Sequence, residues 1–155
     1  MSNCCSTTNA NKDILNFPKK YSCPINKKSY SLVSKTTIKH HIKSPWNLPE
    51  GEQGYYFCSD PNCDVVYFSQ DDFIIHSNQL RTEVGIKVKS RQKTLCYCFG
   101  IDYTQATNEP ELKKFVIDQT RSNACACNIR HPSGKCCLKD FNTIKNNYKI
   151  TRIQL

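Results

Sequence analysis

Long apolar runs are absent from the 155-residue chain. No segment approaches the roughly 18 consecutive apolar residues that a membrane-spanning helix needs. The first residues, MSNCCSTTNANKD, have no apolar core of the kind that a secretory signal needs. We therefore expect a protein of the reducing cytoplasm. A secreted disulfide scaffold is also disfavoured by the odd number of cysteines, 11.

Cysteine is the residue that the chain has in excess. Six of the 11 lie in two short segments, Cys96-Tyr97-Cys98 and CACNIRHPSGKCC from Cys125 to Cys137. In a reducing compartment, clustered cysteines are more often metal ligands or redox groups than disulfides. A 2Fe-2S cluster takes four thiolates, and these two segments have enough. No general acid, base or nucleophile constellation is visible, so the sequence indicates metal binding rather than hydrolysis or group transfer.

The formal net charge of +9 treats all thiols as neutral. Four thiolates on an oxidised 2Fe-2S core leave about −2, and three thiolates on Zn²⁺ leave about −1, so filled sites would lower the net charge to about +6. Much of the case for nucleic-acid binding is thereby removed. A basic face that meets an acidic protein partner stays open, as does a zinc-ribbon module that meets nucleic acid through Tyr55, Tyr56 and Phe57.

The segment from Tyr55 to Ser69, YYFCSDPNCDVVYFS, predicts a β-hairpin. Two aromatic and β-branched runs flank an Asp-Pro-Asn turn, which brings Cys58 and Cys63 to the closed end of the hairpin. This spacing is typical of a zinc knuckle. Upstream, Cys23 opens a Cys-Pro turn before a short strand, but Asn26 stands near the position where zinc ribbons commonly carry a second cysteine.

Several other segments carry weaker predictions. Thr36 or Thr37 could cap a helical turn, in which His40 and His41 are possible but less favoured metal ligands. Residues 71–79 suggest a short helix, and the alternation of Val84, Ile86 and Val88 predicts a half-buried strand.

The C-terminal half is expected to be helical. Asn108 and Pro110 predict the start of an amphipathic helix that ends near Asn123. A last helix is expected to open near residues 133–134 and to carry the apolar side chains Leu138, Phe141, Ile144 and Tyr148. We expect an α+β fold, with a small zinc-ribbon-like β subdomain followed by a helical 2Fe-2S subdomain. The expected divisions are a disordered leader (residues 1–20), the β subdomain (21–95), the helical subdomain (96–148) and a tail (149–155).

The order of motifs YYFC, DVVYF, VGIK, CYCFG and HPSGKCC resembles the N-terminal domain of CopZ-type copper chaperones over about residues 21 to 140. In that family the domain carries one zinc ion and one 2Fe-2S cluster, and the cluster part is similar to bacterioferritin-associated ferredoxin. The resemblance implies zinc ligands at Cys23, Cys58 and Cys63, and cluster ligands at Cys96, Cys98, Cys127 and Cys137. It makes Cys125 and Cys136 neighbours rather than ligands.

Two departures from the family pattern affect the expected function. Asn26 replaces the fourth zinc cysteine, so either Cys4, Cys5, a histidine or water completes the site, or the site is empty. The chain also has no Cys-x-x-Cys pair, the copper-binding loop of the full-length chaperones. We therefore expect a one-electron redox module in copper or soft-metal handling, with possible copper-reductase activity and a redox or copper-handling protein as partner.

Overall fold

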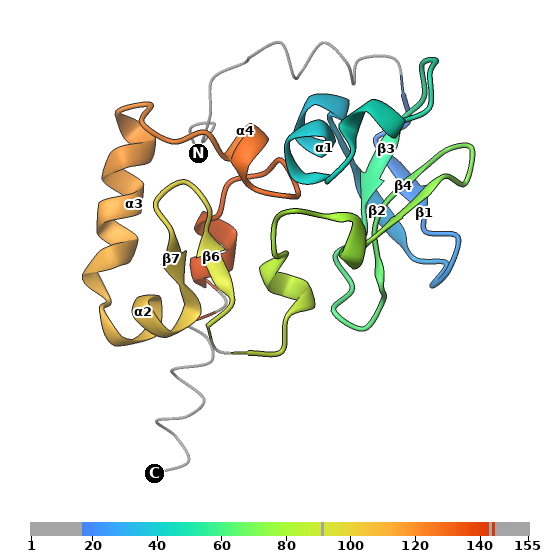
Figure 1. Cartoon of the computed structure of the whole chain (residues 1–155). Helices are drawn as coiled ribbons and strands as arrows, with labels where there is room; N and C mark the ends of the chain where they lie inside the picture. The colour runs from blue at the N-terminus through green and yellow to red at the C-terminus, as the bar shows by residue number, and fades with distance from the viewer. Residues whose placement is uncertain (1–16, 91, 143, 145–155) are drawn as a thin grey trace.

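The computed structural model describes residues 17–90, 92–142 and 144 (Figure 1). Its first part, the sheet unit (residues 20–81), holds a five-stranded antiparallel sheet in sequential order. The strands are β1 (Lys20–Ser22), β2 (Ser29–Val33), β3 (Tyr55–Phe57), β4 (Val65–Ser69) and β5 (Ile74–His76). The helix α1 (Lys35–His41) and two short 3₁₀ turns, η2 (Pro45–Asn47) and η3 (Ser77–Gln79), belong to this unit.

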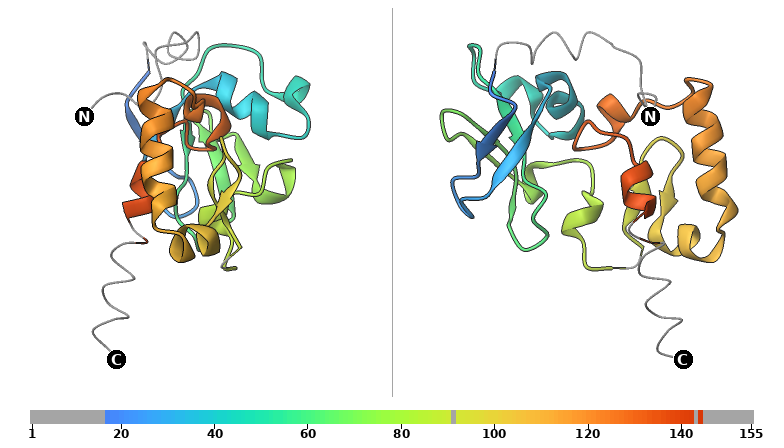
Figure 2. Two further views of the ribbon diagram at one scale, coloured as in Figure 1. Left: turned by 90° about the vertical axis from the view of Figure 1, so that its left-hand side faces the viewer. Right: turned by 180° about the vertical axis from the view of Figure 1, so that it is seen from behind.

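The second part, the helical unit (residues 94–144), lies beside the first (Figures 1 and 2). It has a two-stranded antiparallel ribbon and three helices, and residues 138–142 are also helical. Its elements are β6 (Thr94–Cys96), β7 (Ile101–Asp102), α2 (Tyr103–Asn108), α3 (Glu111–Arg121) and α4 (Cys127–Arg130). A single 3₁₀ turn, η4 (Gly85–Lys87), lies in the segment that joins the two units. The mixed α and β class with an antiparallel sheet is thus confirmed.

The predicted hairpin between Tyr55 and Ser69 is present as β3 and β4. Every residue of both strands is buried, because the sheet is covered on both faces. On one face Tyr56 stacks between Tyr21 and Phe68 at centroid distances of 5.4 and 5.5 Å. The other face packs against α1, which explains why this hairpin reads as a continuous apolar run rather than an alternating one.

The N-cap of helix α1 lies two or three residues earlier than predicted. Its N-cap is Ser34, whose side chain accepts a hydrogen bond from the Thr36 backbone N–H, while Thr37 is buried within the helix. Its buried face also contains Ile38 and His41, and this face turns toward α4.

Two predictions are wrong, one within the sheet unit and one in the segment that joins the two units. Residues 71–79 form no α-helix: Asp72 adopts a positive φ of 59° in a tight turn, and β5 follows as the outer strand of the sheet. The alternating segment at residues 84–88 forms η4 instead of a strand. Ile86 is exposed there, whereas Gly85 is buried against the chain, since a Cβ on it would lie 2.1 Å from the Thr94 carbonyl oxygen.

The helical unit differs from expectation mainly at its helix ends. Asn108 is the last residue of α2 and not a cap, and α3 begins at Glu111 after Pro110. Helix α2 itself was not predicted, although Asp102 and Gln105 form a capping box at its start. On α3 the buried side chains are Val116 and Thr120, while Phe115 is exposed beside Phe99.

The last helical turn starts at residue 138, later than predicted, with Phe141 and Ile144 buried. Tyr148, the tail at residues 149–155 and most of the leader, with Cys4 and Cys5, lie outside the described residues. None of the helices in the described ranges has both the length and the apolar character that a membrane crossing requires.

Candidate metal centres

Three cysteines of the sheet unit come together at the ends of two hairpins. Cys23 lies in the turn between β1 and β2, where Lys27 N–H donates to the Cys23 carbonyl oxygen at 2.9 Å. Cys58 and Cys63 flank the turn between β3 and β4. All three Sγ atoms lie within 4.8 Å of one another, and the residues are 0, 0 and 8% exposed. We call this group the three-cysteine site.

The spacing of these sulfurs fits a metal ion. A tetrahedral Zn²⁺ with Zn–S distances of about 2.3 Å has sulfurs about 3.8 Å apart, so binding needs only a small contraction of the group. Among the described residues, no fourth histidine, cysteine or carboxylate joins the group. The three-cysteine site thus offers three thiolates and one position to be filled from elsewhere.

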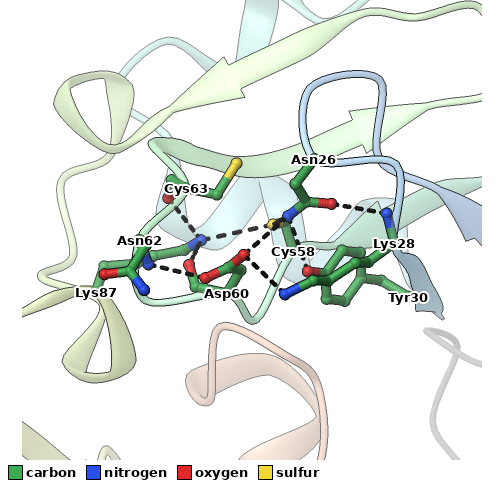
Figure 3. A network of polar contacts seen from close by, with 8 residues as sticks. All are labelled: Asn26, Lys28, Tyr30, Cys58, Asp60, Asn62, Cys63 and Lys87. Atoms are coloured by element: carbon green, nitrogen blue, oxygen red, sulfur yellow. Dashed lines mark hydrogen bonds and ion pairs between the residues drawn. The ribbon is translucent and has the colours of Figure 1, made fainter.

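Polar groups surround Cys58 where a fourth thiolate was expected (Figure 3). Asn26 Nδ2 donates toward Cys58 Sγ at 3.5 Å, the Tyr30 hydroxyl oxygen at 2.9 Å and Asp60 Oδ2 at 3.3 Å. Lys87 Nζ, from η4, approaches Cys58 Sγ at 3.6 Å and donates to the Asp60 and Cys63 carbonyl oxygens. These donors stabilise a thiolate at Cys58 without adding negative charge.

The thiol pKa values follow this environment. Burial acts to raise the pKa of Cys58, but a backbone hydrogen bond at Asp60 and the charge of Lys87 bring it below the ordinary value. Burial raises the pKa of Cys63 to about 11, and the neighbouring Cys58 thiolate contributes to the rise. In the metal-free protein, Cys58 is therefore the first of these two thiols to ionise.

Four cysteines of the helical unit form a second group, the four-cysteine site. Cys96 ends β6, Cys98 follows in the turn before β7, Cys127 begins α4, and Cys137 precedes the last helical turn. The Sγ atoms of Cys98 and Cys127 are 3.6 Å apart. The Cys137 thiol interacts with both Cys127 and Cys96, so the four side chains form a continuous chain of sulfur contacts.

Hydrogen bonds between the thiols favour ionised sulfur at Cys96 and Cys127, whereas the same bonds and burial raise the pKa values of Cys98 and Cys137. Cys96, Cys127 and Cys137 are at most 2% exposed, and Cys98 is partly exposed. Hydrogen bonds from Cys137 and Cys98 hold the pKa of Cys127 well below its usual range, and a bond from Cys137 lowers the pKa of Cys96 to about 7. The Ala126 N–H points at Cys98 Sγ at 3.1 Å. An iron–sulfur cluster needs thiolate ligands and backbone N–H groups that donate to the sulfurs. The four-cysteine site therefore fits an iron–sulfur cluster.

The remaining cysteines of this region lie at the edge of the group. Cys125 packs against the core of the helical unit, and both Cys125 and Cys136 are partly exposed. Cys136 lines a cavity of about 620 Å³ between the two units.

Side chains of the sheet unit hold the loop that carries Cys127. Thr37 Oγ1 donates to the Asn128 carbonyl oxygen at 2.6 Å, and the Tyr67 hydroxyl donates to that of Pro132 at 2.6 Å. His41 Nε2 donates to the Ile129 carbonyl oxygen at 2.7 Å, which leaves Nδ1 to accept from Thr82 Oγ1 at 2.8 Å. Both ring nitrogens of His41 are therefore engaged, which argues against metal ligation by this histidine.

Sequence reasoning did not identify Lys87, Thr37 and Tyr67 as residues that contact the two sites. Lys87 lies 29 residues after Cys58 in the chain. The alternating pattern around Lys87 predicts only a surface residue of a strand. Thr37 and Tyr67 bear no fixed spacing to the cysteines. Such contacts arise from the docking of the two units, which leaves no local sequence signal.

Comparison with known proteins agrees with this arrangement. Residues 20–81 match a CopZ-type family described as a zinc binding domain. The chain is 30% identical over 105 residues to the copper chaperone CopZ of Archaeoglobus fulgidus, which is 65% of this chain and 50% of the relative. The chain thus spans about half the length of this curated relative.

A solved structure shows the same fold. The chain superimposes on the X-ray structure of the CopZ N-terminal domain of Archaeoglobus fulgidus with a TM-score of 0.67 and 26% identity. The match covers 81% of this chain and 98% of that domain. The chain is therefore related to a copper chaperone, and its sheet unit corresponds to a zinc-binding domain with a three-cysteine group capable of holding metal.

Proposed function

We propose that this chain is a two-centre metalloprotein that passes single electrons in copper or soft-metal handling in the cytoplasm. Zinc would be held by Cys23, Cys58 and Cys63 of the three-cysteine site. A 2Fe-2S cluster would be held by the four-cysteine site, which consists of Cys96, Cys98, Cys127 and Cys137. The observation that carries the proposal is the presence of two separate groups of buried cysteine sulfurs, one in each unit.

The two groups suit different chemistry. Zinc has no redox chemistry, and the buried three-cysteine site is suited to fixing the two hairpins. A 2Fe-2S cluster, when bound, supplies a one-electron couple. The chain's own residues bury three of its ligands, and the Ala126 N–H helps to offset negative charge at Cys98. Cys98 is the most exposed of the four, so the surface around it is the proposed route for electrons.

The link to copper rests on the relative. The Archaeoglobus fulgidus protein is a copper chaperone, and this chain matches half of it. Since no Cys-x-x-Cys pair is present, we propose that the chain supplies an electron, such as for the reduction of Cu²⁺ to Cu⁺, to a copper-handling partner.

The first prediction concerns metal content. Protein purified or reconstituted without oxygen is expected to contain two irons, two sulfides and one zinc per chain, with thiolate-to-iron absorption in the visible range. Metal analysis and absorption spectroscopy check this directly. Zinc rising to two per chain while iron stays at trace levels would show that both sites are zinc sites and that the redox function is wrong.

The second prediction concerns Asn26. Replacing it with cysteine is expected to tighten zinc binding, because its side chain already lies 3.5 Å from Cys58 Sγ and a fourth thiolate adds charge to the tetrahedral shell. Competition with a chromophoric chelator measures the affinity, which should rise at least about tenfold. Asn26→Ser is the matched control, since it removes the amide without adding a thiolate. Equal affinity of Asn26→Cys and the unaltered protein would mean that another residue already provides the fourth ligand.

A second candidate function is supported by the cavity between the units. Four lysines line it, and its single acidic residue, Asp140, is paired with His131 at 2.9 Å. The lysines are Lys20, Lys93, Lys135 and Lys139. Positive charge in a concave site attracts acidic partners, so an acidic protein is the favoured alternative ligand. Nucleic-acid stacking on Tyr55, Tyr56 and Phe57 is disfavoured, because these residues are at most 8% exposed.

A further inference from the structure

We propose that η4 (Gly85–Lys87) links the two cysteine groups, so that metal occupancy of the three-cysteine site sets the geometry of the four-cysteine site. Lys87 and Tyr97 are the positioning residues of this link. The inference rests on the proposed function for the nature of the second centre. The contacts that carry it are independent of any metal.

At one end of the link, Lys87 is anchored to the metal-binding turn of the sheet unit (Figure 3). Its ammonium group donates to the carbonyl oxygens of Asp60 and Cys63, the latter at 2.8 Å, and it approaches Cys58 Sγ at 3.6 Å. One side chain therefore touches a thiol of the three-cysteine site and the backbone between its two hairpin cysteines. Its position depends on how that turn is held.

At the other end, the same turn contacts the residue between two cysteines of the four-cysteine site. The Gly85 N–H donates to the Tyr97 hydroxyl oxygen at 2.7 Å, and Tyr97 is flanked by Cys96 and Cys98. The Tyr97 ring also packs edge-on against His131, at a centroid distance of 5.0 Å, in the loop between Cys127 and Cys137. Tyr97 thus contacts both segments that carry the four cysteines.

Between these ends the chain has little freedom. Lys87 N–H donates to the Val84 carbonyl oxygen at 2.9 Å, and Val88 N–H to that of Gly85 at 3.1 Å. Gly85 lies so close to the Thr94 carbonyl oxygen that a Cβ would approach it to 2.1 Å. A displacement of Lys87 is therefore passed to Gly85 and to β6, which ends at Cys96.

Metal binding changes how firmly the hydrogen-bond acceptors of Lys87 are held. A metal ion fixes the Cys58–Cys63 turn and shares the thiolate charge, so the two carbonyl acceptors of Lys87 are held in place. Without the metal the two acceptors are held only by the hydrogen bonds of the turn itself, such as Cys63 N–H to the Asp60 carbonyl oxygen at 3.2 Å, so Lys87 is positioned less firmly. A ligand shifts a conformation only through such a difference in contacts, and any coupling is reciprocal between the two sites.

The first experiment needs no iron. Hydrogen–deuterium exchange of the Gly85 amide is compared in zinc-loaded and chelator-treated protein, with the Val116 amide of α3 as the reference for global unfolding. Zinc removal is expected to speed Gly85 exchange at least about fivefold relative to Val116, the lower end of typical couplings. In Lys87→Met the two states should exchange alike, while the exposed neighbour Lys89→Met keeps the response.

The second experiment measures the cluster. In iron-loaded protein, zinc removal is expected to shift the reduction potential and the electron paramagnetic resonance signature of the reduced centre, and Lys87→Met or Tyr97→Phe should abolish the shift. The control Lys89→Met should leave the shift unchanged. The link is overturned, whatever the iron content, if the Gly85 exchange rate does not change on zinc removal. It is also overturned if the zinc response persists in Lys87→Met. Absence of iron binding would instead refute the proposed function and leave the Gly85 result to support or overturn the link by itself.

Discussion

Cys137→Ser is expected to abolish the visible absorption of the iron-loaded protein, or to shift it strongly, and to lower the bound iron toward zero. Cys137 is 1% exposed and interacts with the thiols of both Cys127 and Cys96. Its loss would remove one of the four proposed ligands and the thiol that contacts both of these cysteines. Iron and sulfide analysis after anaerobic reconstitution measures the effect.

The adjacent Cys136→Ser is the matched control. Side chains of neighbouring residues point in different directions, and Cys136 lines the cavity between the units. Its variant should retain full iron content and an unchanged spectrum. If Cys136→Ser loses the iron and Cys137→Ser retains it, the ligand assignment is displaced by one residue and the proposed four-cysteine site is wrong.

The second large effect is expected from His41. Burial lowers the pKa of its imidazole from 6.5 to about 4. Above pH 6.5 the ring is neutral in both the folded and unfolded protein, and its contribution to stability is complete. As the pH falls toward 4, the unfolded chain takes up the proton first, so the free energy of unfolding decreases. Between pH 7 and pH 5 the decrease from this residue should be about 2 kcal/mol.

His41→Gln separates this titration from other acid effects. A glutamine side chain can still donate toward the Ile129 carbonyl oxygen and accept from Thr82, but it does not titrate. Urea unfolding of both proteins at equal zinc content is the measurement, because thiolate protonation then contributes equally to each. The variant should lose about 2 kcal/mol less than the unaltered protein over this pH range. Parallel pH profiles would exclude His41 as the responsible group.

Features determined by local sequence were predicted well. The hairpin that presents Cys58 and Cys63 follows from two apolar runs around an Asp-Pro-Asn turn, and the structure has it. The body of α3 likewise follows from its apolar spacing and from Pro110. The capping box of α2, between Asp102 and Gln105, is also a local sequence signal for a helix start.

Features determined by distant contacts were not predictable. The alternation of Val84, Ile86 and Val88 fits a strand, but the close approach of Gly85 to Thr94 bends the chain into a 3₁₀ turn. The local pattern of residues 71–79 predicts a helix, because nothing local shows that β4 needs a hydrogen-bonded neighbour. The contact of Lys87 with Cys58 joins residues that are 29 positions apart, so the local sequence around the three-cysteine site carries no signal of it.

The sequential order of the five strands also has a consequence for biosynthesis. Each strand of this sheet pairs with the strand before it, so the sheet unit can form while the rest of the chain is still being translated. At ordinary translation rates Cys137 is added roughly 4 to 15 s after Cys63. The three cysteines of the sheet unit can therefore bind their metal before most of the competing thiols of the helical unit have been synthesised. The timing of synthesis would then help to assign each metal to its own site.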